Sequence, residues 1–155
     1  MAAIRSAGLL LYRLIDSEVE VWIAHMGGPF WSRKDAAAWS IPKGEYDDVE
    51  DPLIAALREF EEEIGSAAPV VDYESLGEFR QSSGKIVTAF AAETDFAVDI
   101  VVSNTFPLEW PPKSGRIQNF PEIDDARWTT LAEARVKLVK GQLQILDALE
   151  QRLAR

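Results

Sequence analysis

Residues 44–66 read GEYDDVEDPLIAALREFEEEIGS, and this stretch is the most informative part of the chain. Asp51 followed by Pro52 predicts a helix start, because an aspartate side chain accepts hydrogen bonds from the first helical amides and a proline at the first helical position loses none. Gly65 is placed to end the helix, since glycine readily adopts the left-handed conformation of a C-terminal cap. We therefore predict a helix from Pro52 to about Ile64.

The helix divides into an apolar stripe and an acidic face. Four apolar residues recur at helical spacing and predict a core-facing stripe: Leu53, Leu57, Phe60 and Ile64. Glu59, Glu62 and Glu63 are predicted on the opposite side, where their like charges repel and oppose the helix dipole. A region that repeatedly breaks local rules indicates a functional site, and this density of carboxylates suits Mg²⁺ or Mn²⁺. The alternative is a solvated acidic face.

The charge of the whole chain is concentrated in this segment. The 155 residues carry a formal charge of −10, but residues 45–63 alone hold nine acids against one base, which leaves the rest nearly balanced. A net negative chain disfavours long nucleic acid as the main partner. With no cysteine and one histidine, thiolate sites and multi-histidine metal centres are excluded. With no signal-peptide pattern and no apolar run that could span a bilayer, we expect a cytoplasmic protein that does not contact a membrane.

The other segments predict strands mixed with two principal helices. Residues 4–14 and 19–24 predict a hairpin joined through 15–18, and residues 26–38 a long loop. Residues 39–41 predict a short strand broken by 42–44, followed after the acidic helix by strands over 73–81, 85–95 and 126–129. Residues 103–122 are expected to be irregular, and 131–153 helical with a break near Gly141. This order predicts an α/β (α+β) fold in one domain over 1–155, a mixed sheet between helices.

The spacing within 44–66 resembles the Nudix box, G-x5-E-x7-R-E-U-x-E-E-x-G-U, in which U is apolar. Seven residues occupy its fixed polar and glycine positions: Gly44, Glu50, Arg58, Glu59, Glu62, Glu63 and Gly65. Phe60 fits the first U, and Ser66 departs from the second. Further segments resemble a bacterial branch of small single-domain Nudix hydrolases, among them Gly27-Gly28-Pro29-Phe30-Trp31 and Glu109-Trp110-Pro111-Pro112. The resemblance implies the Nudix fold for the whole chain.

The resemblance also implies roles inside the box. Nudix enzymes cleave a nucleoside diphosphate linked to another group X, with water and usually Mg²⁺. Glu62 and Glu63 are then expected as metal ligands, and Glu59 as a third ligand or as the base that orients water. The Gly44 carbonyl is a further candidate ligand. Glu50 and Arg58 would form a structural ion pair between loop and helix.

Candidate functional residues outside the box each have a non-functional alternative, either a surface position or core packing. Glu122 is expected as another metal ligand or base, or else as a surface acid. Lys43 is expected to contact phosphate, Trp31 and Trp39 to stack on a base, and Arg5 to bind distal phosphates. Core packing is the alternative for the tryptophans and a solvated charge for the cations. Three more cations are further candidates for distal phosphates: Lys85, Lys113 and Arg116.

These residues predict a Mg²⁺-dependent Nudix pyrophosphohydrolase with a small nucleotide substrate. Dinucleoside polyphosphates, (d)NTPs and nucleotide sugars all fit, and the Pro42-Lys43-Gly44 lead into the box resembles that of dinucleoside polyphosphate hydrolases. The alternative is a non-catalytic nucleotide-binding module with the same fold. The sequence leaves open whether the chain forms a homodimer.

Overall fold

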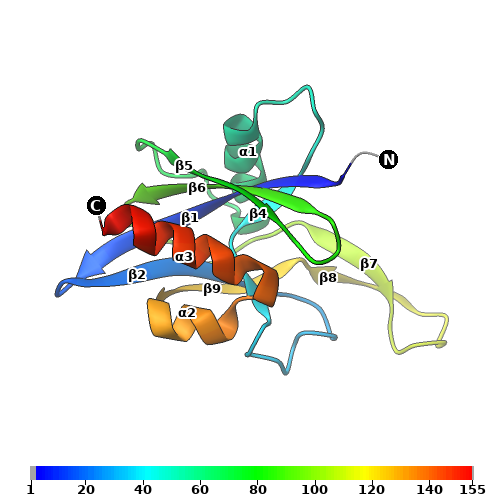
Figure 1. The fold of residues 1–155 in the computed structure, drawn as a ribbon. Helices are drawn as coiled ribbons and strands as arrows, with labels where there is room; N and C mark the ends of the chain where they lie inside the picture. The colour runs from blue at the N-terminus through cyan, green and yellow to red at the C-terminus, as the bar shows by residue number, and fades with distance from the viewer. Residues whose placement is uncertain (1–2, 155) are drawn as a thin grey trace.

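A mixed sheet built around β1 (Arg5–Ile15) forms the centre of the molecule in a computed structural model that describes residues 3–154 (Figure 1). The path of the main sheet is β3-β2-β1-β6-β5, with β4 paired to β1 and β9 paired to β2. β1 runs antiparallel to β2 and β4 and parallel to β6. The other strands of this sheet are β2 (Glu18–Met26), β3 (Trp39–Ser40), β4 (Lys43–Tyr46), β5 (Glu74–Arg80), β6 (Ile86–Glu93) and β9 (Ile123–Thr130).

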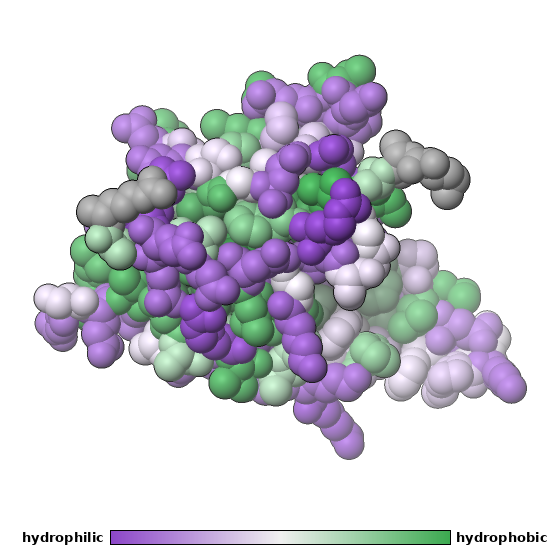
Figure 2. Space-filling view, in the orientation of Figure 1, coloured by the Kyte–Doolittle hydropathy of each residue, from purple (hydrophilic) through white to green (hydrophobic). Residues whose placement is uncertain are grey.

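Helices cover both faces of this sheet, as the sequence predicts. The helices are α1 (Pro52–Ile64), α2 (Leu131–Lys137), the 3₁₀ turn η1 (Lys140–Gln142) and α3 (Leu143–Leu153). Because side chains alternate along a strand, Leu9 and Leu11 of β1 pack in one core with α1, whereas Leu10 packs in the other with α2 and α3. The outer surface over α3 is mainly hydrophilic (Figure 2). Within residues 3–154, no helix combines the length and apolar character that a membrane span requires.

Several segments differ from the sequence prediction. The connection between β1 and β2 needs only Asp16 and Ser17, both with positive φ, as the tight turns of right-twisted hairpins require. The predicted break at residues 42–44 is wrong for Lys43 and Gly44, which belong to β4 and pair with β1. The C-terminal helical region is interrupted as predicted, and the interruption starts already at Leu138.

The expectation of irregular structure over residues 103–122 is also wrong. β7 (Thr105–Glu109) and β8 (Ile117–Pro121) form a separate two-stranded sheet that projects to one side of the main sheet (Figure 1). The prolines in this segment argued against strands, but a strand with only one partner has a free edge at which proline loses no ladder hydrogen bond.

Candidate active site

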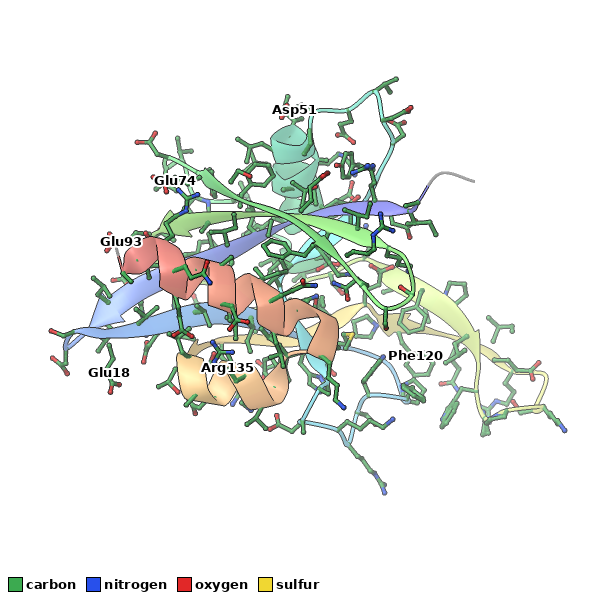
Figure 3. All side chains as sticks on the ribbon, in the orientation of Figure 1. Glu18, Asp51, Glu74, Glu93, Phe120 and Arg135 are labelled. Carbon is green, nitrogen blue, oxygen red and sulfur yellow. The ribbon has the colours of Figure 1, made fainter. Side chains whose placement is uncertain are left out.

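The ends of α1 are fixed by the two residues that the sequence marks as caps. The Asp51 carboxylate accepts hydrogen bonds from the amides of Leu53 (3.1 Å) and Ile54 (3.2 Å) at the start of the helix (Figure 3). Gly65 has φ +84°, and its amide donates to the carbonyl of Glu61 at 2.8 Å. This capping sets the helix register and places the carboxylates in the last two turns.

The expectation that the glutamates of α1 lie opposite the core is wrong for Glu59 and Glu63, which turn toward the sheet, whereas Glu62 is exposed. The predicted apolar stripe is confirmed, since Phe60 and Ile64 are fully buried and Leu53 and Leu57 pack partly buried against the same core. Ala55 and Ala56 are also fully buried. Small alanine side chains let the helix approach β1 and β4 closely, so that Glu59 and Glu63 lie within the packed side of the helix. The Glu59 side chain is only 16% exposed, compared with 43% for Glu62.

Gly44 of β4 provides the space that the Glu59 carboxylate occupies. A Cβ atom at Gly44 would lie 1.9 Å from Oε2 of Glu59, a separation that real atoms do not adopt. In the same strand, the amide of Lys43 donates to Oε2 of Glu63 at 3.3 Å. The carboxylates of Glu59 and Glu63 on α1 therefore pack directly against the backbone of β4 at Gly44 and Lys43.

Arg58 joins the loop before the helix to the carboxylates of the helix. Its Nε and Nη2 donate to the two oxygens of Glu50 at 3.0 and 2.8 Å, and its Nη1 donates to Glu59 at 2.7 Å. A weaker contact reaches Glu62 at 3.4 Å. The hydrogen bonds from Arg58 lower the pKa of Glu50, and this two-point pairing fixes the guanidinium plane.

Electrostatics within the site favour a bound cation. Burial raises the pKa of Glu63 to about 8, and the negative charges of Glu122 and Glu59 add to this effect while Lys43 opposes it. Burial also raises the pKa of Glu59, against the opposing hydrogen bond from Arg58. Carboxylates that are costly to ionise together gain most from a hard divalent cation, so the donor chemistry fits Mg²⁺ or Mn²⁺.

The carboxylates are not gathered around one point. Within residues 3–154, no three acidic or histidine side chains come close enough to count as a formed metal site. The physical reason is Arg58, which draws Glu59 and Glu62 toward its own guanidinium. A cation bound here would have to compete with that guanidinium for the same oxygens.

A cavity of about 430 Å³ opens beside Glu63, and neither Glu59 nor Glu62 lines it. Glu63, Glu122, Lys43 and Gly44 all line it. A larger hollow, of about 630 Å³, lies on the other side of α1 and is lined mainly by apolar residues of the helix and of the segment 67–73. Of the predicted site residues this second hollow contains only Arg58, so the smaller cavity is the candidate active site.

The aromatic residues expected to stack on a base lie elsewhere. The expectation is wrong for Trp39, which is 3% exposed, donates through Nε1 to Asp35 and packs edge-on against His25. Trp31 is partly buried against the core and contacts the ring of Phe30, outside the lining of the cavity.

Arg5 also lies outside the cavity. Its guanidinium pairs with Glu78 at 2.7 Å, and it borders a separate hollow near residues 45–48. Neither this ion pair nor that hollow contains a carboxylate of α1, so the structure does not bring Arg5 together with the predicted metal ligands.

Gln142 of η1 is a site residue that the sequence did not indicate. Its side chain is 1% exposed and lines the cavity. Its Oε1 accepts from the amide of Ile41 at 2.9 Å, and its Nε2 donates to Oγ of Ser40 at 2.8 Å. These bonds support the end of β3 just before Lys43. A lone glutamine at a helix break carries no sequence signal for this role.

Comparison with known proteins gives consistent matches. The family model described as "NUDIX domain" matches residues 5–149. An RNA pyrophosphohydrolase from Acidiphilium cryptum (strain JF-5) is 31% identical over 136 residues, which cover 78% of this chain and 75% of that protein.

Solved structures show the same fold. The NUDIX domain of Shewanella oneidensis NrtR, solved in complex with ADP-ribose, superposes with a TM-score of 0.66 at 18% identity and covers 99% of this chain and 90% of that one. A C. elegans Ap4A hydrolase, solved as a binary complex, superposes with a TM-score of 0.62 at 22% identity, with 98% of each chain covered.

Proposed function

This chain belongs to the Nudix family of pyrophosphohydrolases, and from that premise we propose that it uses Mg²⁺ to hydrolyse a phosphoanhydride bond in a nucleoside diphosphate linked to a further group. The observation that carries the proposal is the placement of Glu59 and Glu63 against Gly44 and Lys43, beside a cavity that Glu122 also lines. We further propose that a single domain over residues 1–155 carries the activity, which the family match over 5–149 supports.

Glu59, Glu62, Glu63 and the carbonyl of Gly44 are the proposed metal ligands. When bound, a divalent cation supplies neutralisation of phosphate charge and a more acidic water. Glu122 or Glu59 would accept the proton of the attacking water, since Glu122 lines the cavity and acts electrostatically on Glu63. Arg58 and Glu50 hold the loop and the helix together and are not expected to touch the substrate.

We propose a dinucleoside polyphosphate or a (d)NTP as the substrate class. The Pro42-Lys43-Gly44 sequence at the start of the box supports the former, and the position of Lys43 in the cavity lining supports a contact with phosphate. The 31% identity to an RNA pyrophosphohydrolase supports a second candidate, the 5′ phosphates of an RNA. The cytoplasmic location and the use of Mg²⁺ rather than Mn²⁺ stay predictions, and the oligomeric state stays open.

A panel of substrates with Mg²⁺ tests the proposal. ATP, a four-phosphate dinucleotide, ADP-ribose and a 5′-triphosphorylated oligoribonucleotide are incubated with the protein, and the products are identified. AMP plus ATP from the dinucleotide, or a monophosphate plus pyrophosphate from the triphosphate, would support hydrolysis of the linker. Binding without turnover of any substrate would contradict the proposal and favour a nucleotide-binding module.

A further inference from the structure

The cations of this acidic protein fall into two groups. Within residues 3–154, seven pair with a carboxylate: Arg5, Arg13, Arg58, Arg127, Arg135, Lys137 and Arg152. The other eight of the described segment have no carboxylate within 4.0 Å: Arg33, Lys34, Lys43, Arg80, Lys85, Lys113, Arg116 and Lys140. An unpaired cation in a chain with surplus acid is free to bind an anionic ligand.

Only two of these unpaired cations line the active-site cavity, Lys43 and Lys85. They approach it from opposite sides of β1. Lys43 is in β4, where it is paired with Gly8 of β1, and Lys85 precedes β6, whose first residue pairs with Arg5. The cavity is thus bounded by one lysine beside the carboxylates of α1 and by a second lysine across the central strand.

The turn that carries Lys85 is held firmly in place. Within the turn, the amide of Gln81 donates to the carbonyl of Lys85 at 2.7 Å. The Gln81 side chain donates to the carbonyl of Gly141 at 3.1 Å, and Gln144 donates to the carbonyl of Arg80 at 3.1 Å. Figure 1 shows this β5–β6 turn beside the end of α3 that adjoins η1. The turn is therefore a fixed wall of the cavity.

Gly141 is the contact point that allows this docking. A Cβ atom there would lie 1.9 Å from Oε1 of Gln81, so the glycine admits the glutamine side chain. The same short turn, η1, also carries Gln142, which supports the end of β3 before Lys43. One element thus supports both of the segments from which the two lysines project.

The two lysines differ in what surrounds them. Lys43 acts directly on Glu63, so its charge is partly used by the carboxylates of α1. Lys85 is exposed, lines the cavity together with Gln81 and Ser83 of its own turn, and forms no ion pair with a described carboxylate. A linker of two phosphates can be neutralised beside the glutamates by the bound cation and Lys43, whereas further phosphates bring further negative charge toward Lys85.

We propose that Lys85 is a specificity-determining residue, which binds the phosphates furthest from the carboxylates of α1 and so favours linkers of three or more phosphates over linkers of two. This inference rests on the proposed function. Of the four cations that the sequence suggests for binding distal phosphates, only Lys85 remains a candidate. Arg5 is paired with Glu78, and Lys113 and Arg116 lie in the loop of the β7–β8 hairpin, away from the cavity lining.

Kinetic comparison of Lys85→Ala with the unmodified protein tests this assignment. For a four-phosphate dinucleotide, kcat/KM should fall roughly tenfold, mainly through KM, because a charge-assisted contact is lost. For ADP-ribose the change should stay below about twofold, since its two phosphates are expected beside the carboxylates of α1 and not at Lys85. Lys85→Arg should recover most of the loss. Lys113→Ala removes an unpaired lysine that does not line the cavity, so kcat/KM should be unchanged with both substrates. Equal losses for both substrates, or no loss for either, would overturn the inference.

A binding measurement separates this inference from the proposed hydrolysis. Calorimetric titration with inorganic tripolyphosphate and with pyrophosphate, in the presence of Mg²⁺, needs no turnover. Lys85→Ala should weaken tripolyphosphate binding roughly tenfold and leave pyrophosphate binding within about twofold. If no nucleotide is hydrolysed but this difference is found, the proposed function fails and the role of Lys85 stands. Equal affinities of the variant and the unmodified protein for tripolyphosphate would refute the role of Lys85.

Discussion

Helices α1 and α3 cover opposite faces of the same sheet, yet they use their charged residues in opposite ways. α3 buries Ile145, Leu146 and Leu149 and keeps its charges outside. α1 buries Phe60 and Ile64 together with two alanines, and it also turns Glu59 and Glu63 toward the sheet. Both helices are amphipathic, but only α1 places like charges where solvent screens them poorly.

The charges of α3 are matched with opposite charges. Arg135 of α2 lies between Asp147 and Glu150 of α3, and Arg152 pairs with Glu74 at 2.7 Å (Figure 3). These side chains are well exposed, so each pair contributes little. The charges of α3 thus contribute to solubility, whereas α1 keeps a charge arrangement that Arg58 offsets only at Glu59 and Glu62 and leaves unfavourable at the buried Glu63.

The largest predicted effect is at Glu63. Glu63→Gln should lower kcat by about 1000-fold or more, because the buried carboxylate is the proposed metal ligand. At neutral pH the same change should raise the melting temperature of the metal-free protein, since Glu63 must take up a proton on folding and glutamine need not. Activity assays and thermal unfolding in EDTA measure both effects. Full activity of the variant, or a lower melting temperature without metal, would contradict the assignment of Glu63 as a buried metal ligand.

The stability effect at Glu63 should depend on pH. Its pKa in the folded protein, about 8, exceeds the value of about 4.3 expected for an unfolded chain. Below both values Glu63 is protonated in either state and resembles glutamine, so the two proteins should be equally stable. As pH rises toward 8, the unfolded chain gives up this proton first, and the unmodified protein should lose stability relative to Glu63→Gln. A stability gap that stays constant from pH 4 to pH 8 would contradict this assignment.

Gly44→Ala should have the next largest effect. The new Cβ would displace the Glu59 carboxylate, which Arg58 and the surrounding packing hold in place. A misplacement of about 1 Å near the reacting groups can cost roughly 100-fold in rate, so kcat should fall by about that factor. The melting temperature should fall by only a few degrees, because Glu59 is at the edge of the core. Unchanged kinetics would show that the position of Glu59 does not matter for turnover.

The contrast between the two helices was only partly predictable from the sequence. Asp51 and Gly65 mark the ends of α1 through local rules, and the capped helix appears as predicted. Which way its glutamates point could not be predicted, because periodicity identifies Leu53 and Leu57 as core residues but does not reveal that Ala55 and Ala56 pack closely on β1 and β4. Close approach of small residues is a property of the partner strands.

Long-range contacts limit prediction in the rest of the site for the same reason. Lys85, Gln142 and Lys43 line one cavity only because β1 brings β4 and β6 together and η1 docks on the β5–β6 turn. For Trp39 the sequence leaves base stacking and core packing both open, and strand pairing and the bond to Asp35 place it in the core. A sequence pattern does not distinguish these outcomes, because both depend on which distant segments pack together.

Arg58→Ala should moderately lower both the stability and the activity of the protein. It leaves Glu50, Glu59 and Glu62 without their shared cation. Arg58 is 39% exposed, so screening limits the expected loss to about 1 kcal/mol, or roughly 2–4 °C in melting temperature. Activity should fall as well, because Glu59 loses the contact that fixes its position. An unchanged melting temperature would contradict the scaffold role, and saturating Mg²⁺ should restore part of the stability.

The smallest predicted effect lies on α3 and is the matched control for Glu63. Glu150→Gln also replaces a helical glutamate by glutamine, but Arg135 keeps Asp147 as a partner at 2.8 Å, and the Glu150 side chain is 45% exposed. Because water solvates both the charged and the neutral form, the stability should change by less than about 0.5 kcal/mol and kcat should be unchanged. Side-by-side melting curves and kinetics for the two variants measure the contrast. If Glu150→Gln stabilised the protein as much as Glu63→Gln, general charge repulsion in an acidic chain would explain both, and the distinct role of α1 would be lost.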